Sequence, residues 1–287
     1  MSVSGSGWVW IAFYLVFWGW LIARWSVSWV LGDALGIAAG EPFVDPALIR
    51  PLSRSLAFAM THLPSLAQGA WMTIVLTLVS IALGFVIAVP LSVARVYGNV
   101  SAWIALVYTE LVRGTPLLAQ LFVLYYGLGL SSWIRELPLV DVGPIPGQAF
   151  WVAIIGFTIN SAAYQAEYIR ASLQSVDGGQ LTAARAVGMT NLQGIRYVML
   201  PQGLRYAIPA WSNELVYLIK YSSLASFITV PELYEVASRI ASSNYRYTAI
   251  FTLVALLYLG IVISAANLTA RIEDVVSIPG MGQSGSR

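Results

Sequence analysis

The sequence predicts an all-α protein, a polytopic bundle of membrane-spanning helices. Hydrophobic residues make up 58% of the 287 residues and charged residues only 10%, with a mean hydropathy of +0.75. Soluble domains carry roughly 25% charged residues, so this composition indicates a chain that lies in a lipid bilayer. The apolar residues also fall into separated blocks close to the roughly 20 residues that one spanning helix needs.

Six apolar blocks predict six spanning helices. The first, 8–25, belongs to a stretch with six tryptophans up to Trp29 and lacks the small-residue cleavage pattern of a signal peptide, so we interpret it as a retained helix. The next segment, 31–65, mixes Gly, Pro, Asp, Glu and Arg, which is typical of a linker or a short surface helix. The other predicted spans are 68–96, 103–130, 149–171, 204–228 and 247–271.

This pattern divides the chain into four parts: an extra helix at 1–30, a linker at 31–65, a five-helix core at 66–275 and a flexible tail at 276–287. Loops rich in Lys and Arg stay in the cytoplasm, so arginine placement predicts the orientation. The loop at 172–201 and the residues flanking it are rich in arginine, as is the C-terminal end. The arginines concerned are Arg170, Arg185, Arg196, Arg205, Arg271 and Arg287. Both termini and this loop are therefore expected inside the cell, and the linker outside.

The loop between the fourth and fifth spans has the pattern of two short helices. The stretch "DGGQLTAARAVGM" starts with turn formers, continues through good helix formers and stops at Gly188, which suits a left-handed cap. A second piece, "NLQGIRYVML", is predicted to end at Pro201, because proline lacks the backbone donor. We interpret the pair as a docking element. The alternative, an amphipathic helix on lipid, needs a clearer basic face with bulky apolar residues opposite.

Polar residues inside the predicted spans outline a candidate substrate path. A charged side chain at the bilayer centre costs at least ~2.5–3.5 kcal/mol unless it finds partners or water. Such residues share helical faces at spacings of three, four or seven. The faces are Asn213, Tyr217, Lys220 and Leu224, with Glu214 and Tyr221 beside them, on the fifth span; Asn160, Tyr164 and Glu167 on the fourth; and Arg113 and Gln120 on the third.

Each face also has a second interpretation, in which polar groups hydrogen-bond neighbouring helices and never touch cargo. Glu110 and Arg113 are three residues apart and can pair with each other. Gly114, Thr115 and Pro116 interrupt the third span, and a proline-bent helix frees backbone groups that can bind the ends of a zwitterion.

The loop resembles the coupling loop of permease subunits of bacterial ATP-binding cassette importers. In that pattern Glu-Ala-Ala is followed after three residues by Gly, and after nine more by Ile-x-Leu-Pro. Here Ala183, Ala184 and Gly188 match, and the ending keeps the leucine and proline; Thr182 replaces the glutamate. The resemblance implies the type I importer permease fold and a set of ATPase-coupling residues. These are Gly179, Gln180, Thr182, Ala183, Ala184, Gly188, Leu200 and Pro201.

Three further segments resemble the polar amino acid branch of that family. They are "ELVRGTPLLAQLFVLYYGL" at 110–128, "NSAAYQAEYIRASLQSV" at 160–176 and "PAWSNELVYLIKYSSLAS" at 209–226. They occur in the family's order, and the resemblance covers roughly residues 66–275. With the polar faces above, it gives the candidate substrate path. Its residues are Thr115, Gln120, Asn160, Tyr164, Asn213, Glu214, Lys220, Tyr221, Ser222 and Ser223.

The resemblance also implies the partners. A separate ATPase dimer would bind ATP and magnesium, because this chain has no G-x-x-x-x-G-K-[ST] motif and needs no cofactor of its own. A second permease, identical or related, and a periplasmic or lipid-anchored amino-acid-binding protein would complete the importer in the bacterial cytoplasmic (inner) membrane. No nucleic acid partner is expected.

The resemblance fails at one position of the candidate path. Tyr221 stands where relatives commonly place an aspartate after the lysine. Without that carboxylate, the site is expected to favour acidic or amide amino acids over arginine, lysine and histidine.

Two other function classes fit the sequence less well. An ion-coupled secondary carrier, the alternative, would usually show internal repeats with broken helices in corresponding halves, and the sequence has none. A membrane enzyme needs a converging nucleophile, base or metal set. The chain has no cysteine, and its single histidine, His62, has no nearby carboxylate cluster. No catalytic or metal-binding residues are therefore expected.

Overall fold

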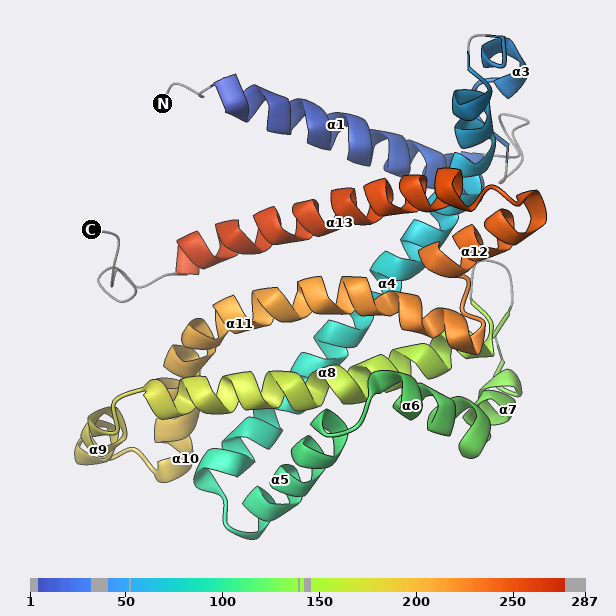
Figure 1. Cartoon of the computed structure of the whole chain (residues 1–287). Coiled ribbons are helices and arrows are strands. Elements are labelled where there is room, and N and C mark those ends of the chain that lie inside the picture. The colour runs from blue at the N-terminus through green and yellow to red at the C-terminus, as the bar shows by residue number, and fades with distance from the viewer. Residues whose placement is uncertain (1–4, 32–40, 52, 139, 142–145, 277–287) are drawn as a thin grey trace. The chain divides into compact units, whose positions relative to one another are not determined.

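The structure is a computed structural model that describes residues 5–31, 41–51, 53–138, 140–141 and 146–276 (Figure 1). The described residues form helices and no strand, which confirms the all-α class. The α-helices are α1 (Gly5–Ser26), α3 (Pro46–Ile49), α4 (Arg54–Tyr97), α5 (Val100–Arg113), α6 (Leu117–Phe122), α7 (Leu130–Arg135), α8 (Gln148–Ser175), α9 (Gly179–Ala186), α10 (Asn191–Gly194), α11 (Leu200–Tyr221), α12 (Leu233–Asn244) and α13 (Tyr247–Val276). The predicted tail lies outside the described residues, apart from Val276 at the end of α13.

Three of the described helices are long and apolar enough to cross a membrane: Trp8–Trp29, α4 and α13. The predicted span at 149–171 forms α8, and the predicted span at 204–228 forms α11 and the 3₁₀ helix Ser222–Ile228 that follows it. Both α8 and α11 are less apolar because they carry the polar faces. The predicted third span is interrupted as expected. Its first part, α5, ends at Arg113, and α6 begins at Leu117 after the Gly114–Thr115–Pro116 break.

Two predicted boundaries were wrong. Residues 54–65 belong to α4 rather than to the linker, and the Ser53 side chain accepts a hydrogen bond from the Leu56 amide at its start (3.2 Å). Pro201 does not end a helix. A π-helical turn, Ile195–Met199, leads directly into α11, and Pro201 lies in the first turn of that helix, where a missing backbone donor costs little.

The chain forms two compact units, and several long helices contribute to both. The first comprises Met1–Leu76, Leu124–Ala153 and Ile219–Ser264; the second comprises Thr77–Val123, Ile154–Leu218 and Ala265–Arg287. In the first unit, two tryptophan side chains of α1 form hydrogen bonds to α4 and α13. The Trp25 indole donates to the Ala67 carbonyl (2.8 Å), and the Trp18 indole donates to the Ser264 hydroxyl (2.9 Å).

A buried carboxyl group holds the start of α12 in the same unit. Glu232 is fully buried and accepts hydrogen bonds from the Tyr234 and Glu235 amides (2.9 and 2.8 Å) and from the Tyr258 hydroxyl (2.9 Å). The Leu233 amide donates to the Thr73 hydroxyl (3.2 Å). Gly69 allows this close approach, because a Cβ there would lie 2.8 Å from the Leu233 Cα.

Glu232 gives a testable pH dependence. Burial raises the pKa of Glu232 to about 7, so the folded protein favours the neutral carboxyl group. The stability that protonation provides is present at low pH and is lost as the pH rises through about 7. We expect the Tm of the purified protein to fall by roughly 5 °C between about pH 5 and about pH 8. Glu232→Gln should flatten this profile, and parallel profiles for the two proteins would contradict the assignment.

Candidate functional site

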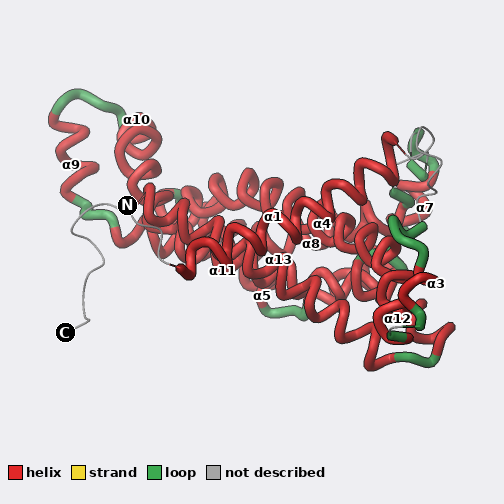
Figure 2. Tube along the Cα trace, turned by 90° about the horizontal axis from the view of Figure 1, so that it is seen from above, coloured by secondary structure: helices red, strands yellow, loops and turns green. Residues whose placement is uncertain are grey.

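The predicted docking element is a pair of short helices after α8 (Figure 2). The first, α9, spans Gly179–Ala186, and Gly188 has a φ of +87°, which confirms the predicted left-handed position. Thr190 caps α10: its hydroxyl accepts from the Gln193 amide (3.3 Å), and the Gln193 side chain accepts from the Thr190 amide (2.8 Å). The two helices touch at Gly194, where a Cβ would lie 2.7 Å from the Leu181 side chain.

The loop has an inward and an outward face. Ala184 is buried, whereas Gly179, Gln180, Thr182 and Ala183 are exposed. Two large apolar side chains are also exposed here, Val187 (75%) and Leu192 (72%). Neither side chain was among the predicted docking residues, because single exposed apolar residues are common on protein surfaces and give no clear signal in a sequence.

The loop joins the apolar core of the second unit at its base. Leu200 and Leu204 pack against a cluster that includes Ile169 and Leu173 of α8. Gly203 permits tight contact, because a Cβ there would lie 2.6 Å from Leu173. The end of α8 and the start of α11 are thus packed together. The segment that contains α9 and α10 therefore begins and ends at the same place in the core.

The predicted polar faces of the third and fourth spans meet within the second unit. The Asn160 amide donates to the Gln120 carbonyl oxygen (3.1 Å). The Gln120 amide donates to the Thr115 hydroxyl (2.9 Å) and to the Val112 carbonyl (2.7 Å). Pro116, four residues after Val112, has no N–H to donate to that carbonyl, which also accepts a hydrogen bond from the Thr115 amide (3.4 Å). Beside them, the Arg113 guanidinium lies over the Tyr164 ring, 5.5 Å from its centre.

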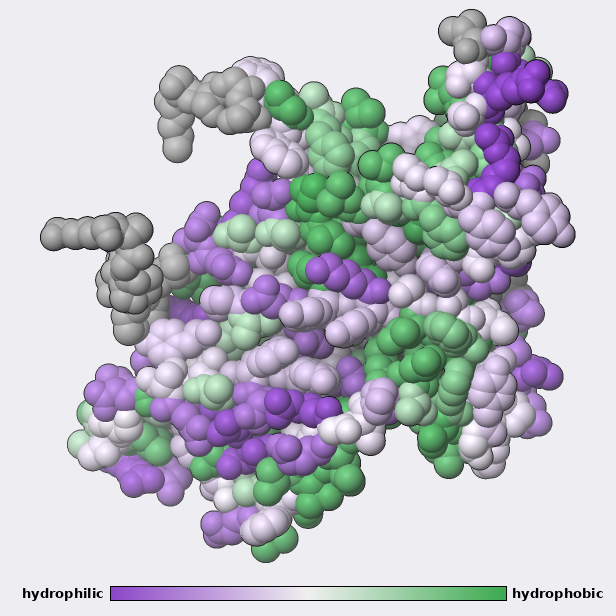
Figure 3. All heavy atoms as spheres, viewed as in Figure 1, coloured by the Kyte–Doolittle hydropathy of each residue, from purple (hydrophilic) through white to green (hydrophobic). Residues whose placement is uncertain are grey.

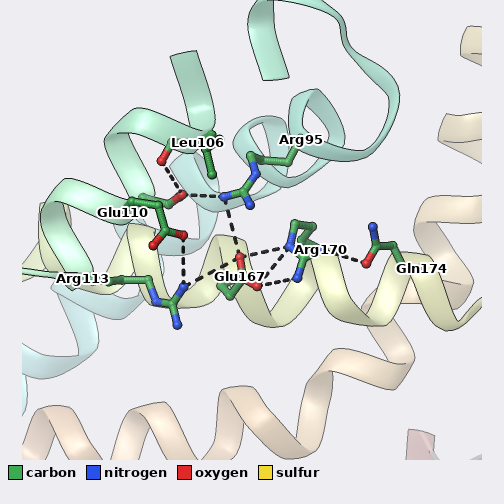
Figure 4. Close-up of polar contacts among 8 residues, drawn as sticks. Arg95, Leu106, Glu110, Arg113, Glu167, Arg170 and Gln174 are labelled. Atoms are coloured by element: carbon green, nitrogen blue, oxygen red, sulfur yellow. Dashed lines mark hydrogen bonds and ion pairs between the residues drawn. The ribbon is translucent and has the colours of Figure 1, made fainter. Parts of the chain in front are cut away.

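Glu167 is the centre of a charged cluster at the same contact (Figure 4). Its carboxylate lies 3.7 Å from Arg95 of α4, 3.8 Å from Arg113 of α5 and within hydrogen-bond distance of Arg170 of α8. The predicted pair of Glu110 and Arg113 is present at 3.8 Å. Figure 3 shows the resulting band of hydrophilic residues between α8 and α5. This cluster ties three helices together, which supports the stabilising interpretation for these residues.

Glu214 also lies inside the second unit. Its exposed fraction is 4%, and it accepts hydrogen bonds from the Ser161 hydroxyl (3.1 Å) and the Tyr168 hydroxyl (3.4 Å). Asn213, the preceding residue on the chain, is exposed. Adjacent candidates on α11 therefore point in different directions, and the exposed face is the one that carries Asn213 and Tyr217.

The remaining candidates belong to the first unit. Lys220 and Tyr221 are exposed at the end of α11, while the Ser222 hydroxyl is buried and donates to the Ile219 carbonyl (2.8 Å). Lys220 and Ser223 line a cavity of about 480 Å³ with residues of α12 and α13. Across the described parts of both units, no three His, Cys, Asp or Glu residues gather where they could hold a metal ion.

Comparison with known proteins identifies relatives over most of the chain. Residues 80–277 match the family described as "binding-protein-dependent transport system inner membrane component". The octopine transport system permease protein OccM of Rhizobium meliloti is 38% identical over 212 residues, which cover 73% of this chain and 84% of OccM. The glutamine transport system permease protein GlnP of Escherichia coli is 32% identical over 75% of this chain and 94% of GlnP.

A solved structure with a similar fold is the crystal structure of an amino acid ABC transporter with histidines. It matches with a TM-score of 0.63 and 32% identity, and the match covers 74% of this chain and 94% of that chain. The inward-facing MetNI methionine ABC transporter matches with a TM-score of 0.61 at 24% identity, which shows the fold alone.

Proposed function

Because the chain belongs to the family of inner-membrane components of binding-protein-dependent transport systems, we propose that it carries a polar amino acid through the membrane. It is a multi-pass membrane permease subunit, and in this family the ATPase activity resides in a separate subunit. The relatives named as amino acid, octopine and glutamine permeases support amino acids as the cargo class. The family's description as an inner-membrane component supports the bacterial inner membrane as the proposed location.

The proposed mechanism rests on one observation, that the α9–α10 loop is exposed at its surface and packed into the core at its base. It presents exposed Thr182 and Ala183 beside the exposed apolar residues Val187 and Leu192, and its base is packed into the core at Leu173 and Gly203. We propose that an ATPase dimer clasps this loop on the cytoplasmic side. Closure of the ATPase would then move α8 and α11, a two-state change that nucleotide binding biases. A second permease and an amino-acid-binding protein complete the proposed assembly.

The proposed cargo path follows the exposed polar residues of each unit. In the second unit, the exposed Thr115 is joined through Gln120 to the buried Asn160, and Asn213 is exposed on α11. In the first unit, Lys220 and Tyr221 are exposed where α11 ends. The buried Glu214 and Ser222 would support this path without lining it.

Tyr221 is proposed to set the charge preference, with acidic or amide amino acids favoured over basic ones. A tyrosine cannot offer a carboxylate to a guanidinium or ammonium group. Tyr221→Asp is expected to raise uptake of arginine or lysine relative to glutamine by roughly tenfold, equivalent to one charge-assisted hydrogen bond. Competition between labelled amino acids measures this ratio, with Tyr221→Asn as the matched uncharged control. Wild-type protein that takes up arginine or lysine in preference to glutamate and glutamine would overturn the proposed preference.

Reconstitution tests the proposed function as a whole. Proteoliposomes that contain the permease, its ATPase and its binding protein are expected to accumulate a polar amino acid only when ATP is supplied. The same vesicles without the ATPase should show no accumulation. Accumulation driven by an ion gradient without the ATPase would instead establish the alternative, a secondary carrier.

A further inference from the structure

An apolar cavity of about 360 Å³ lies in the second unit beside the first turns of α11. Its walls come from four helices. They include Phe85 of α4, Ile169 of α8, Leu204, Ile208 and Trp211 of α11, and Ile272 of α13. Ile272 is 38% exposed, so the cavity is open to the surroundings of the chain at this end.

The uncharged polar side chains in the wall, Gln165 and Tyr168, already form hydrogen bonds within the protein. Gln165 donates to the Ile81 carbonyl (3.1 Å) and accepts from the Trp211 indole (2.8 Å). The Tyr168 hydroxyl donates to Glu214 (3.4 Å). These contacts leave the cavity with apolar surface, and an apolar cavity of this kind does not hold ordered water.

Among the described residues, Arg205 is the one charged residue that lines the cavity. It is exposed and, among the residues that the structure describes, it makes no hydrogen bond or ion pair. The carboxylates of Glu273 and Asp274 neighbour Ile272 in the sequence but do not line the cavity. The unpaired guanidinium suits the phosphate of a phospholipid, and the apolar cavity beside it suits an acyl chain.

We propose that this cavity binds an anionic phospholipid, with an acyl chain against Ile208 and Trp211 and the phosphate paired with Arg205. Lipid chains are the apolar solvent around a membrane protein, and basic pockets between spanning helices suit anionic head groups. A free phosphate ion would leave the apolar walls without a partner. Residues 204, 208 and 211 lie on the opposite side of α11 from Asn213 and Tyr217, so this lipid is separate from the cargo path.

The position of the cavity gives the lipid a role at the base of the coupling loop. Leu204 lines the cavity and also packs against the cluster that contains Leu173, next to the close contact at Gly203. A bound acyl chain would therefore support the junction of α8 and α11. Assignment to the cytoplasmic leaflet rests on the proposed function, which places this loop in the cytoplasm.

The test compares lipid retention by variants of the assembled importer. Each complex is purified from membranes that contain equal phosphatidylglycerol and phosphatidylethanolamine, and retained lipid is identified by native mass spectrometry. The variants are Arg205→Gln, which removes the head-group contact, and Ile208→Trp, which fills the cavity. Arg135→Gln, at an exposed arginine that ends α7, is the matched control.

Wild-type and Arg135→Gln complexes are expected to retain phosphatidylglycerol in preference to phosphatidylethanolamine. Arg205→Gln should lower that retention by about fivefold, and Ile208→Trp should abolish it. Equal retention in Arg205→Gln and wild type, or equal amounts of the two lipids, would overturn the proposal. So would a cavity filled by a side chain of the second permease. The readout is bound lipid and not transport. The lipid proposal can therefore fail while the proposed function holds, and the reverse.

Discussion

Ala183→Arg is expected to abolish ATP-driven uptake while the chain still folds. Ala183 is exposed on α9, so a long side chain is accommodated in the isolated chain. In the groove of an ATPase, however, the substitution would bury an unpaired charge. A cost of about 3 kcal/mol weakens docking by about 100-fold, and uptake should fall accordingly. The measurements are ATP-driven amino acid uptake and co-purification of the ATPase.

Ser242→Arg is the matched control, because Ser242 is exposed on α12, outside the proposed docking surface. It is expected to keep both uptake and co-purification. Melting curves of the two variants show whether folding is equally preserved. Wild-type uptake by Ala183→Arg would remove α9 from the proposed coupling path.

Glu167→Ala is expected to lower the free energy of unfolding by about 2–4 kcal/mol, because it leaves three neighbouring guanidinium groups without their common partner. The Glu167 side chain is 19% exposed and those of Arg95 and Arg113 are 13% and 32% exposed, so solvent screens the cluster only in part. Thermal unfolding in detergent measures the loss as a fall in Tm.

Glu110→Ala provides the matched comparison. The Glu110 side chain is 60% exposed and contacts Arg113 at 3.8 Å, so its removal should cost less than about 1 kcal/mol. If repulsion among the arginines is the cause, Arg113→Gln combined with Glu167→Ala should recover part of the lost Tm. Similar Tm values for Glu167→Ala and Glu110→Ala would show that the cluster does not stabilise the bundle.

Features that depend on local sequence were predictable. The left-handed position of Gly188, the break between Arg113 and Leu117, and the shared face of Asn160, Tyr164 and Glu167 all follow from residue type and helical spacing. These features depend on neighbours within a turn or two, which the sequence displays directly.

Features that depend on distant partners were not predictable. Arg95 and Glu167 lie in different helices, and the sequence around neither residue indicates that the two form an ion pair. The burial of Glu214 against Ser161 and of Glu232 against Tyr258 is likewise set by tertiary packing. Pro201 misled the helix boundary because a proline in the first turn of a helix looks the same in sequence as one that ends a helix.

The most direct test of the central claim is a cross-link from α9 to the ATPase. The chain contains no cysteine, so Ala183→Cys introduces a single reactive thiol on the exposed face of the coupling loop. A thiol-reactive cross-linker is expected to join this variant to the ATPase subunit in the assembled importer, with a yield that changes when ATP is added. Ser242→Cys should give no such product. Absence of the product from Ala183→Cys, or equal yields at both positions, would contradict the account.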